Sequence, residues 1–204
     1  MRMLVVGGTG RTGRLVVERA LGRGHDVASL SRSNSDITHP RLTVLRGDAT
    51  DFETVRSAVA GRTAVALTIG SSGSGVHEAV AGNVVHAMAE QGASRLAVMS
   101  AAGAFARKDP ALGIGFRALI ATTLRSTYDD LEAMERRVMA SDLDWTIVRP
   151  VGLSDSPPTG DYRVSLDGSI PRKVSRISRS DVAAVILKAL ETDAFHRRTL
   201  VVAQ

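Results

Sequence analysis

Short apolar segments alternate along the chain with longer segments of helical periodicity. The short segments are apolar almost without interruption, which is typical of parallel strands that helices cover on both faces. They span residues 3–6, 26–30, 42–45, 63–69, 96–99 and 145–148. The longer segments, predicted to form helices, span residues 12–23, 51–60, 75–91 and about 114–140. This alternation predicts repeated β-α-β units and a parallel sheet.

The last quarter of the chain departs from this alternation. Residues 154–160 read as a turn-rich loop, residues 162–166 as a short peripheral strand and residues 199–202 as a final strand. We expect this quarter to cap the carboxyl ends of the strands, where open α/β sheets bind ligands. The prediction is a single α/β domain over residues 1–204, with a doubly wound parallel sheet, helices on both faces and a small C-terminal cap.

Polar residues mark the starts of two predicted helices. Thr50 and Glu53 have the spacing of a capping box at the second helix. Ser180 and Asp181 are expected to cap an amphipathic helix over residues 182–190.

Composition narrows the class of protein. At 204 residues the chain is long enough for one domain with a substantial core and short for two. It has no cysteine, which excludes disulfides and thiolate metal sites and favours a reducing cytoplasm. The chain opens on a strand-like segment instead of a signal peptide, and no apolar stretch reaches the length of a membrane span. We expect a cytoplasmic protein with no membrane partner.

The net charge of +5 raises the question of nucleic-acid binding. The basic residues are scattered, however, and their densest clusters are pairs such as Arg136-Arg137. Aromatic residues, which would stack on bases, make up only 3% of the chain. We therefore expect no nucleic-acid partner, and interpret the charge as a modest positive field around an anionic small molecule. A monomer is expected rather than an obligate oligomer.

The strongest motif is the glycine-rich run Gly-Gly-Thr-Gly-Arg-Thr-Gly at residues 7–13. It follows the first predicted strand and opens the first predicted helix, which is the context of a Rossmann-type dinucleotide site. Glycines permit the tight turn, and the helix N-terminus presents N–H groups and a partial positive charge to a pyrophosphate. A turn that is glycine-rich for steric reasons alone is the other interpretation. The candidate cofactor contacts here are Gly7, Thr9, Gly10, Arg11, Thr12 and Gly13.

The end of the second strand indicates which dinucleotide is bound. Proteins that select NAD place an acidic residue there to bind the ribose 2′-hydroxyl. This chain has Ser31-Arg32 instead, with no carboxylate before Asp36. The planar cation of Arg32 suits a 2′-phosphate, with Ser31 as a further donor, so NADP(H) is the predicted cofactor. A solvated surface arginine remains the alternative.

Other strand ends supply further candidates at the same edge of the sheet. Asp48, followed by Ala49, is placed to bind the adenine amino group, although a turn or capping carboxylate explains it equally well. Ile69, Gly70 and Ser71 open a glycine-serine segment that we expect over the nicotinamide half, unless it is only a flexible linker. Ser100 follows the fifth strand and is the candidate catalytic residue; a helix cap or turn is the alternative role.

Several of these motifs together resemble the atypical short-chain dehydrogenases/reductases of the NmrA-like group. They are the glycine run, Leu-Ser-Arg at 30–32, Gly-Asp-Ala at 47–49, Val-Met-Ser-Ala at 98–101 and Trp-Thr-Ile-Val-Arg-Pro at 145–150, which ends on the further candidate Pro150. Residues 153–168 and 177–182 are similar to the NADPH-dependent flavin reductases, the biliverdin reductase B group. The resemblance covers almost the whole chain. It implies NADPH and hydride delivery to a planar conjugated acceptor.

The chain lacks two groups that these relatives have at their reaction sites. The flavin reductases have a histidine shortly after the strand that ends in proline, whereas residues 149–153 here are Arg-Pro-Val-Gly-Leu, with Gly152. The Tyr-x-x-x-Lys pair of ordinary short-chain dehydrogenases is also absent, because Tyr128 is followed four residues on by Glu132. The histidines lack metal-ligand spacing, so no metal is expected.

The function predicted from the sequence is an NADPH-dependent oxidoreductase that transfers hydride to a flavin, a quinone or a similar planar conjugated acceptor. The protein would supply binding and orientation while the cofactor carries the hydride chemistry. Two alternatives use the same cofactor turn: an NmrA-like redox sensor that binds NADP without turnover, and an NAD(P)-dependent isomerase.

Overall fold

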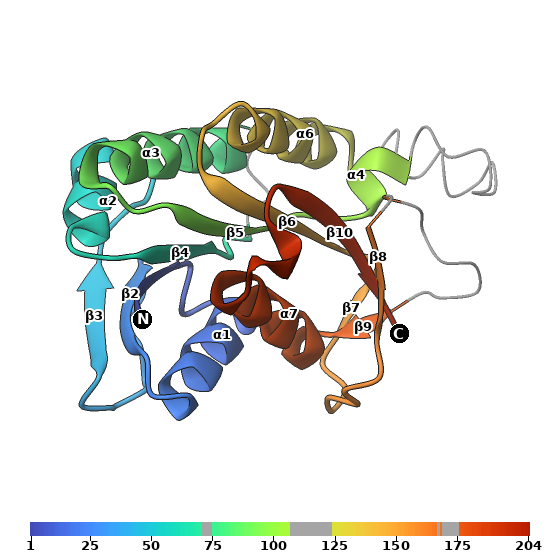
Figure 1. The fold of residues 1–204 in the computed structure, drawn as a ribbon, viewed down its shortest axis with the longest axis horizontal. Coiled ribbons are helices and arrows are strands. Elements are labelled where there is room, and N and C mark those ends of the chain that lie inside the picture. The colour runs from blue at the N-terminus through green and yellow to red at the C-terminus, as the bar shows by residue number, and fades with distance from the viewer. Residues whose placement is uncertain (71–74, 107–123, 167, 169–175) are drawn as a thin grey trace.

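The computed structural model describes residues 1–70, 75–106, 124–166, 168 and 176–204. Its centre is a twisted sheet of eight strands in the order β3-β2-β1-β4-β5-β6-β10-β8 (Figure 1). All neighbours are parallel except the last pair, β10 and β8. The strands are β1 (Arg2–Val6), β2 (Asp26–Ser31), β3 (Leu42–Arg46), β4 (Ala64–Leu67), β5 (Arg95–Met99), β6 (Asp144–Pro150), β8 (Arg163–Ser165) and β10 (Arg198–Ala203).

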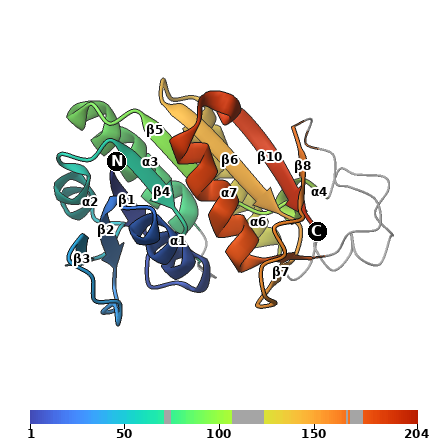
Figure 2. The ribbon, with the colours of Figure 1, turned by 60° about the horizontal axis from the view of Figure 1, so that its bottom comes forward.

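Helices cover both faces of this sheet. Figure 1 shows α2, α3 and α6 on one face and α1 and α7 on the other, and Figure 2 shows α1 and α7 side by side. The long helices are α1 (Arg11–Gly22), α2 (Phe52–Val59), α3 (Val76–Gln91), α6 (Arg125–Met139) and α7 (Arg179–Glu191). The short elements are α4 (Gly103–Ala106), the 3-10 helix η1 (Asp193–Phe195), and β7 (Leu153–Ser154), which pairs with β9 (Ile177–Ser178).

The alternating side chains of the central strands feed two separate cores. On β1, Leu4 and Val6 are fully buried against the face of α2, α3 and α6, whereas Met3 and Val5 are fully buried against the face of α1 and α7. Each such side chain contributes about 1.5–3 kcal/mol when it is removed from water. Burial on both faces explains why these strands are apolar almost without a break.

The order of strands creates the place where a ligand binds in folds of this kind. From β1 the chain moves outward through β2 to β3, and then returns to β4 on the other side of β1 and moves through β5 to β6. Because β1 leads to α1 on one face and β4 is followed by α3 on the other, a crevice opens at the carboxyl ends of these strands. The glycine run begins there, directly after β1.

The predicted α/β architecture is confirmed, with corrections at its edges. The segment 42–45 was expected to be covered on both faces, but β3 is an edge strand whose Val44 is 43% exposed. Helix α2 is capped by Asp51, whose carboxylate accepts from the Thr54 N–H at 2.9 Å, and not by Thr50. Helix α7 begins earlier than expected because Ser178, not Ser180, is its cap. Residues 107–123, which include the start of the predicted helix at about 114–140, lie outside the described residues.

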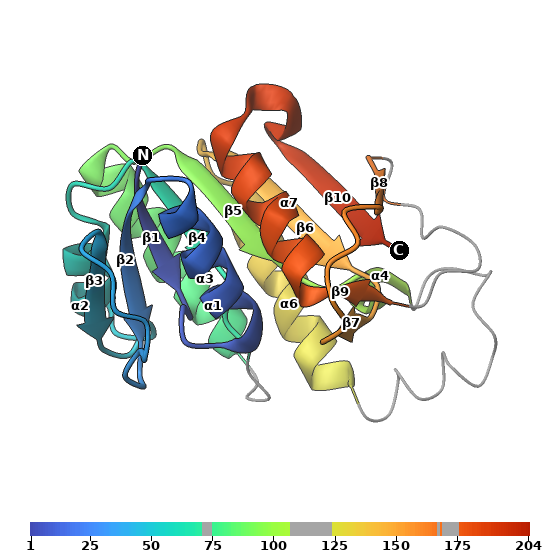
Figure 3. The same cartoon turned by 90° about the horizontal axis from the view of Figure 1, so that it is seen from below.

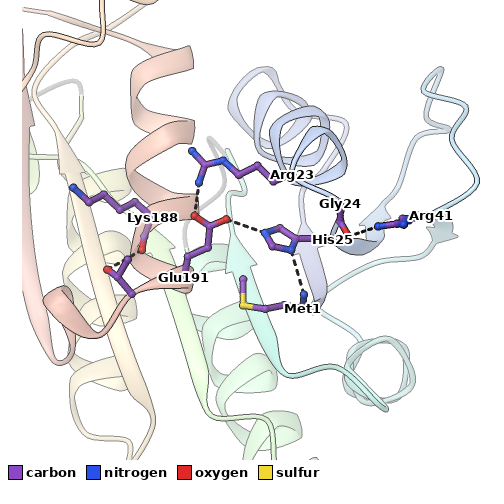
Figure 4. Close-up of polar contacts among 8 residues, drawn as sticks. Met1, Arg23, Gly24, His25, Arg41, Lys188 and Glu191 are labelled. Carbon is purple, nitrogen blue, oxygen red and sulfur yellow. Dashed lines mark hydrogen bonds and ion pairs between the residues drawn. The ribbon is translucent and has the colours of Figure 1, made fainter.

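The amino edge of the sheet, opposite the crevice, is tied by a polar network (Figure 4). The ring of His25 lies between the amino group of Met1, 3.2 Å from Nδ1, and the carboxylate of Glu191, 2.8 Å from Nε2. Arg23 also pairs with Glu191. The network joins the end of α1 to the end of α7.

Candidate functional site

The glycine run forms a tight turn that only glycine permits at its first position. Gly7 has a φ of +83°, and a side chain there would lie 3.1 Å from the backbone of Thr68 and Ile69. The Gly10 N–H donates to the Gly7 carbonyl at 2.9 Å, which closes the turn. Gly13 is required for packing: a Cβ there would lie 2.1 Å from the Gly7 carbonyl oxygen and 2.6 Å from the Thr68 hydroxyl.

The N-terminus of α1 is open to an anion. Gly10 is the N-cap and provides no side-chain hydrogen bond to the first turn. The N–H groups of Arg11, Thr12 and Gly13 therefore have no partner within the helix. A Cβ on Gly10 would meet only the Gly7 carbonyl, at 3.1 Å, so the space beyond this glycine is clear. These unpaired donors, the helix dipole and the clear space fit a pyrophosphate.

The turn is held against the end of β2 by a side chain. The Thr9 N–H donates to the Ser31 hydroxyl at 3.1 Å, and that hydroxyl donates to the Leu30 carbonyl at 2.7 Å. Ser31 is buried, so it is a structural tether for the turn; its one hydroxyl proton is already used.

A cavity of about 450 Å³ opens beside this turn. It is bordered by the glycine turn, the ends of β2, β3 and β4, and the first two turns of α3. Its lining residues are Val6, Gly7, Thr9, Gly10, Leu30, Ser31, Arg32, Ser33, Gly47, Asp48, Ala49, Thr50, Thr68, Ile69, Gly70, Val76 and Val80. The cavity therefore brings together Gly7, Thr9, Gly10, Arg32, Asp48, Ala49, Ile69 and Gly70 of the predicted site.

The charged residues at one end of the cavity favour a bound phosphate. Asp36, the first carboxylate after β2, is held by Arg14, whose Nη1 lies 2.8 and 2.7 Å from its two oxygens. That contact lowers the pKa of Asp36 below its ordinary value. Within the described part of the chain, no hydrogen bond or ion pair engages the guanidinium of Arg32, which is exposed at the cavity. Arg32 thus stands at this end as a cation that no carboxylate of the described residues pairs with directly, although the charge of Asp48 acts on it from nearby.

Asp48 stands at the same end of the cavity in an Asx turn. Its Oδ1 accepts from the Thr50 N–H at 2.9 Å and from the Thr50 hydroxyl at 2.8 Å. These bonds, together with the charge of Arg32, lower the pKa of Asp48. The carboxylate is ionised at neutral pH. Asp48 therefore shapes its own turn and is also one of the residues that line the cavity.

The remaining predicted residues lie outside the cavity lining. Arg11 is exposed, and its Nη1 is 3.5 Å from Asp155, which also receives Arg179 Nη1 at 2.6 Å. Thr12 and Gly13 are buried in the first turn of α1. Pro150 is buried at the end of β6, where its carbonyl accepts from the Ala102 N–H at 3.0 Å. Ser71 lies outside the described residues.

Ser100 is 6% exposed at the carboxyl end of β5. Its N–H donates to the Val148 carbonyl at 2.8 Å, which continues the pairing with β6. Its hydroxyl has no hydrogen-bond partner among the described residues. An unpaired buried hydroxyl is costly, and Ser100 is not among the residues that line the cavity.

The start of α3, which forms one wall of the cavity, is held from α6. Asp130 accepts from the backbone N–H groups of His77 and Glu78 at 2.9 and 3.0 Å, and from His77 Nδ1 at 2.8 Å. Both side chains of this pair are buried. Burial alone would raise the pKa of Asp130, but the three donors outweigh it and lower the pKa. Asp130 thus caps a helix whose N-cap, Gly75, offers no side chain.

The sequence interpretation missed several residues of the cavity. Val76 and Val80 are four positions apart on α3, and their helical spacing would have placed them on one face. Thr68 is the residue that directly follows β4, one before the candidates that were chosen. Ser33, Gly47 and Thr50 adjoin residues that were chosen, but nothing in their own pattern distinguishes them.

No helix in the described ranges is both long enough and apolar enough to cross a membrane. No group of three or more histidine and acidic side chains suited to a metal ion occurs in those ranges.

Comparisons with known proteins agree with the geometry. A family model described as NAD(P)H-binding matches residues 7–193. A 3-beta-hydroxysteroid dehydrogenase of Mycolicibacterium neoaurum is 48% identical over 61 residues, which are 29% of this chain and 17% of that protein. The chain therefore spans less than a fifth of this curated relative.

Two solved structures show the same fold. A short-chain dehydrogenase/reductase of Veillonella parvula in complex with NADP is 20% identical and superposes with a TM-score of 0.83, over 100% of this chain and 94% of that one. A Streptococcus pneumoniae protein named as a candidate NADH-flavin reductase is 21% identical, with a TM-score of 0.76 over 100% of this chain and 99% of that one.

Proposed function

Because the chain belongs to the NAD(P)H-binding family, we propose that it is an NADPH-dependent oxidoreductase that reduces a flavin, a quinone or a similar planar conjugated acceptor. The observation that carries the proposal is the cavity at the carboxyl ends of β1, β2, β3 and β4. It joins an open helix N-terminus to Arg32, a cation at the end of β2 that forms no ion pair among the described residues. The pyrophosphate of a dinucleotide suits the first feature, and the 2′-phosphate of NADP suits the second.

The preference for NADPH rests on Arg32. A guanidinium binds a phosphate through paired, charge-assisted hydrogen bonds, which a ribose hydroxyl does not provide. At the end of β2, the position of the carboxylate that favours NADH, this chain has Arg32, and the first carboxylate that follows, Asp36, is engaged by Arg14. Ser31 contributes less than the sequence suggested, because its hydroxyl holds Thr9 and Leu30.

In the proposed reaction this chain binds and orients, and the bound nicotinamide supplies the hydride. The first turn of α1 holds the pyrophosphate, and Arg32 holds the 2′-phosphate. Ser100, buried and unpaired, donates a hydrogen bond to the nicotinamide amide or to an acceptor carbonyl. With Glu132 where the Tyr-x-x-x-Lys pair would have lysine, proton delivery from solvent suits an acceptor whose reduced form is stable as an anion.

The flat acceptor is supported by the solved relative named as a candidate NADH-flavin reductase, which has this fold. Measuring NADPH oxidation against a panel of free flavins and quinones tests the proposal. We expect turnover with at least one of them. Tight NADPH binding without oxidation by any acceptor of the panel would replace the reductase by a protein that senses NADP without turnover.

A further inference from the structure

Asn83 lies in the middle of α3, on the side of the helix that faces the loop between β3 and α2. Its amide Nδ2 donates to two consecutive backbone carbonyls, that of Ala49 at 3.1 Å and that of Thr50 at 2.9 Å. Both acceptor residues line the cavity, but Asn83 itself does not. One side chain therefore holds a piece of the cavity wall from behind.

The wall in question is the turn over residues 47–50. Its near end is attached to the sheet, because the Gly47 N–H donates to the Ser31 carbonyl at 3.1 Å. Its middle is shaped internally by the bonds from Thr50 to the Asp48 carboxylate. Among the hydrogen bonds of the described residues, those from Asn83 are the ones that join this turn to α3.

We propose that Asn83 is a positioning residue for the adenosine half of the dinucleotide. It fixes the turn over residues 47–50 so that Asp48 and Ala49 face the adenine end of the cavity. The inference rests on the proposed function, since it assumes that a dinucleotide occupies this cavity. It assigns to α3 a role in adenine recognition, in addition to the wall that Val76 and Val80 form.

Neighbouring contacts make this role separable from folding. Phe52 at the start of α2 stacks on His86 of α3, with ring centroids 4.7 Å apart. Val55, Val59, Val80 and Val84 of the same two helices are buried in the core. This apolar packing is untouched when the Asn83 amide is removed, so the turn gains freedom while the helices stay packed.

The test uses the two halves of the cofactor as probes. 2′,5′-ADP carries the adenosine half with its 2′-phosphate, and reduced nicotinamide mononucleotide carries the other half. In Asn83→Ala we expect the Kd for both 2′,5′-ADP and NADPH to rise about tenfold, equivalent to about 1.4 kcal/mol. The kcat/KM with reduced nicotinamide mononucleotide should not change. Asn83→Asp is of equal size but places a carboxylate against two carbonyl oxygens, which repel it. The Kd for 2′,5′-ADP and NADPH should therefore rise more in Asn83→Asp than in Asn83→Ala.

Calorimetric titration of 2′,5′-ADP reads the effect without turnover. Glu90→Ala is the matched control, because Glu90 is exposed on the same helix, lies outside the cavity lining and pairs with His86 at 3.3 Å; it should bind 2′,5′-ADP as the wild type does. An unchanged Kd in both Asn83 variants overturns the inference, as does an equal loss for both halves of the cofactor. If neither variant folds, Asn83 holds the fold and the inference is again overturned. A wild type that binds neither NADPH nor 2′,5′-ADP instead refutes the proposed function.

Discussion

Replacing Arg32 by alanine should separate the two nicotinamide dinucleotides. The change removes the cation at the end of β2 and leaves the glycine turn and the Ser31 tether in place. A hydrogen bond to a charged group contributes about 1.5–3 kcal/mol net. At 1.4 kcal/mol per factor of ten, NADPH binding should weaken about ten- to a hundredfold. Arg32 is exposed, so screening by solvent and salt places the expected loss toward the lower end of this range.

Cofactor fluorescence, titrated for NADPH and NADH at two salt concentrations, measures this change. The loss for NADPH should shrink at high salt, because a charge-charge contact is screened, and NADH binding should hardly change. Arg46→Ala is the control for net charge: Arg46 is an exposed arginine at the end of β3, outside the cavity lining. An equal loss for both cofactors, or the same loss in the control, refutes the assignment of Arg32 to the 2′-phosphate.

Three further predictions concern the turn, the acceptor side and the wall of the cavity. Gly10→Val should abolish NADPH binding and leave the circular dichroism spectrum unchanged, because Gly10 has an ordinary φ of −69° and its side chain, apart from a contact of its Cβ with the Gly7 carbonyl oxygen at 3.1 Å, would extend into the space proposed for the pyrophosphate; unchanged affinity would mean that the phosphate binds elsewhere. Ser100→Ala should slow NADPH oxidation with saturating flavin about tenfold, near the value of one neutral hydrogen bond of about 1 kcal/mol, as stopped-flow absorbance would show; a loss above about a thousandfold would make Ser100 a catalytic acid. Asp130→Asn should destabilise the fold by about 2 kcal/mol at neutral pH. Since the pKa of Asp130 is lower in the folded chain than in the unfolded one, its stabilisation is complete above an unfolded pKa of about 4 and is lost as the pH falls through the folded value. Thermal melting should therefore depend more steeply on acid pH in the wild type than in Asp130→Asn, and parallel curves would contradict this.

The order of elements was predictable because buried parallel strands leave long apolar runs. The same signal says nothing of a strand's place in the sheet, which is why the exposure of Val44 on β3 was not foreseen. Helix caps were displaced by one or two residues, since Thr50, Asp51, Ser178 and Ser180 are all chemically able to cap. Only the backbone conformation decides which of them does.

The residues of the candidate site likewise fall into those that a local motif predicts and those that it does not. Gly7 and Gly10 lie within one turn, so their spacing in the sequence is enough to predict that they act together. Asp130 and Asn83 act on segments 52 and 33 positions away, respectively, and their own surroundings in the sequence resemble any amphipathic helix. Contacts made across the fold leave no local pattern in a single sequence.

The pairing of α1 with α7 sets a condition on how the chain folds as it is synthesised. Figure 3 shows the two helices together over one face of the sheet, and Arg19 of α1 bonds to Ser180 of α7 across 161 residues. The opposite face can begin to close earlier, when α2 and α3 have been made. The apolar face of β1 and β4 stays incompletely covered until the ribosome has delivered α7. Such long-range closure is slow, and nascent chains with uncovered apolar surface are prone to associate. The docking of α7 is therefore the step that removes the apolar face of β1 and β4 from solvent.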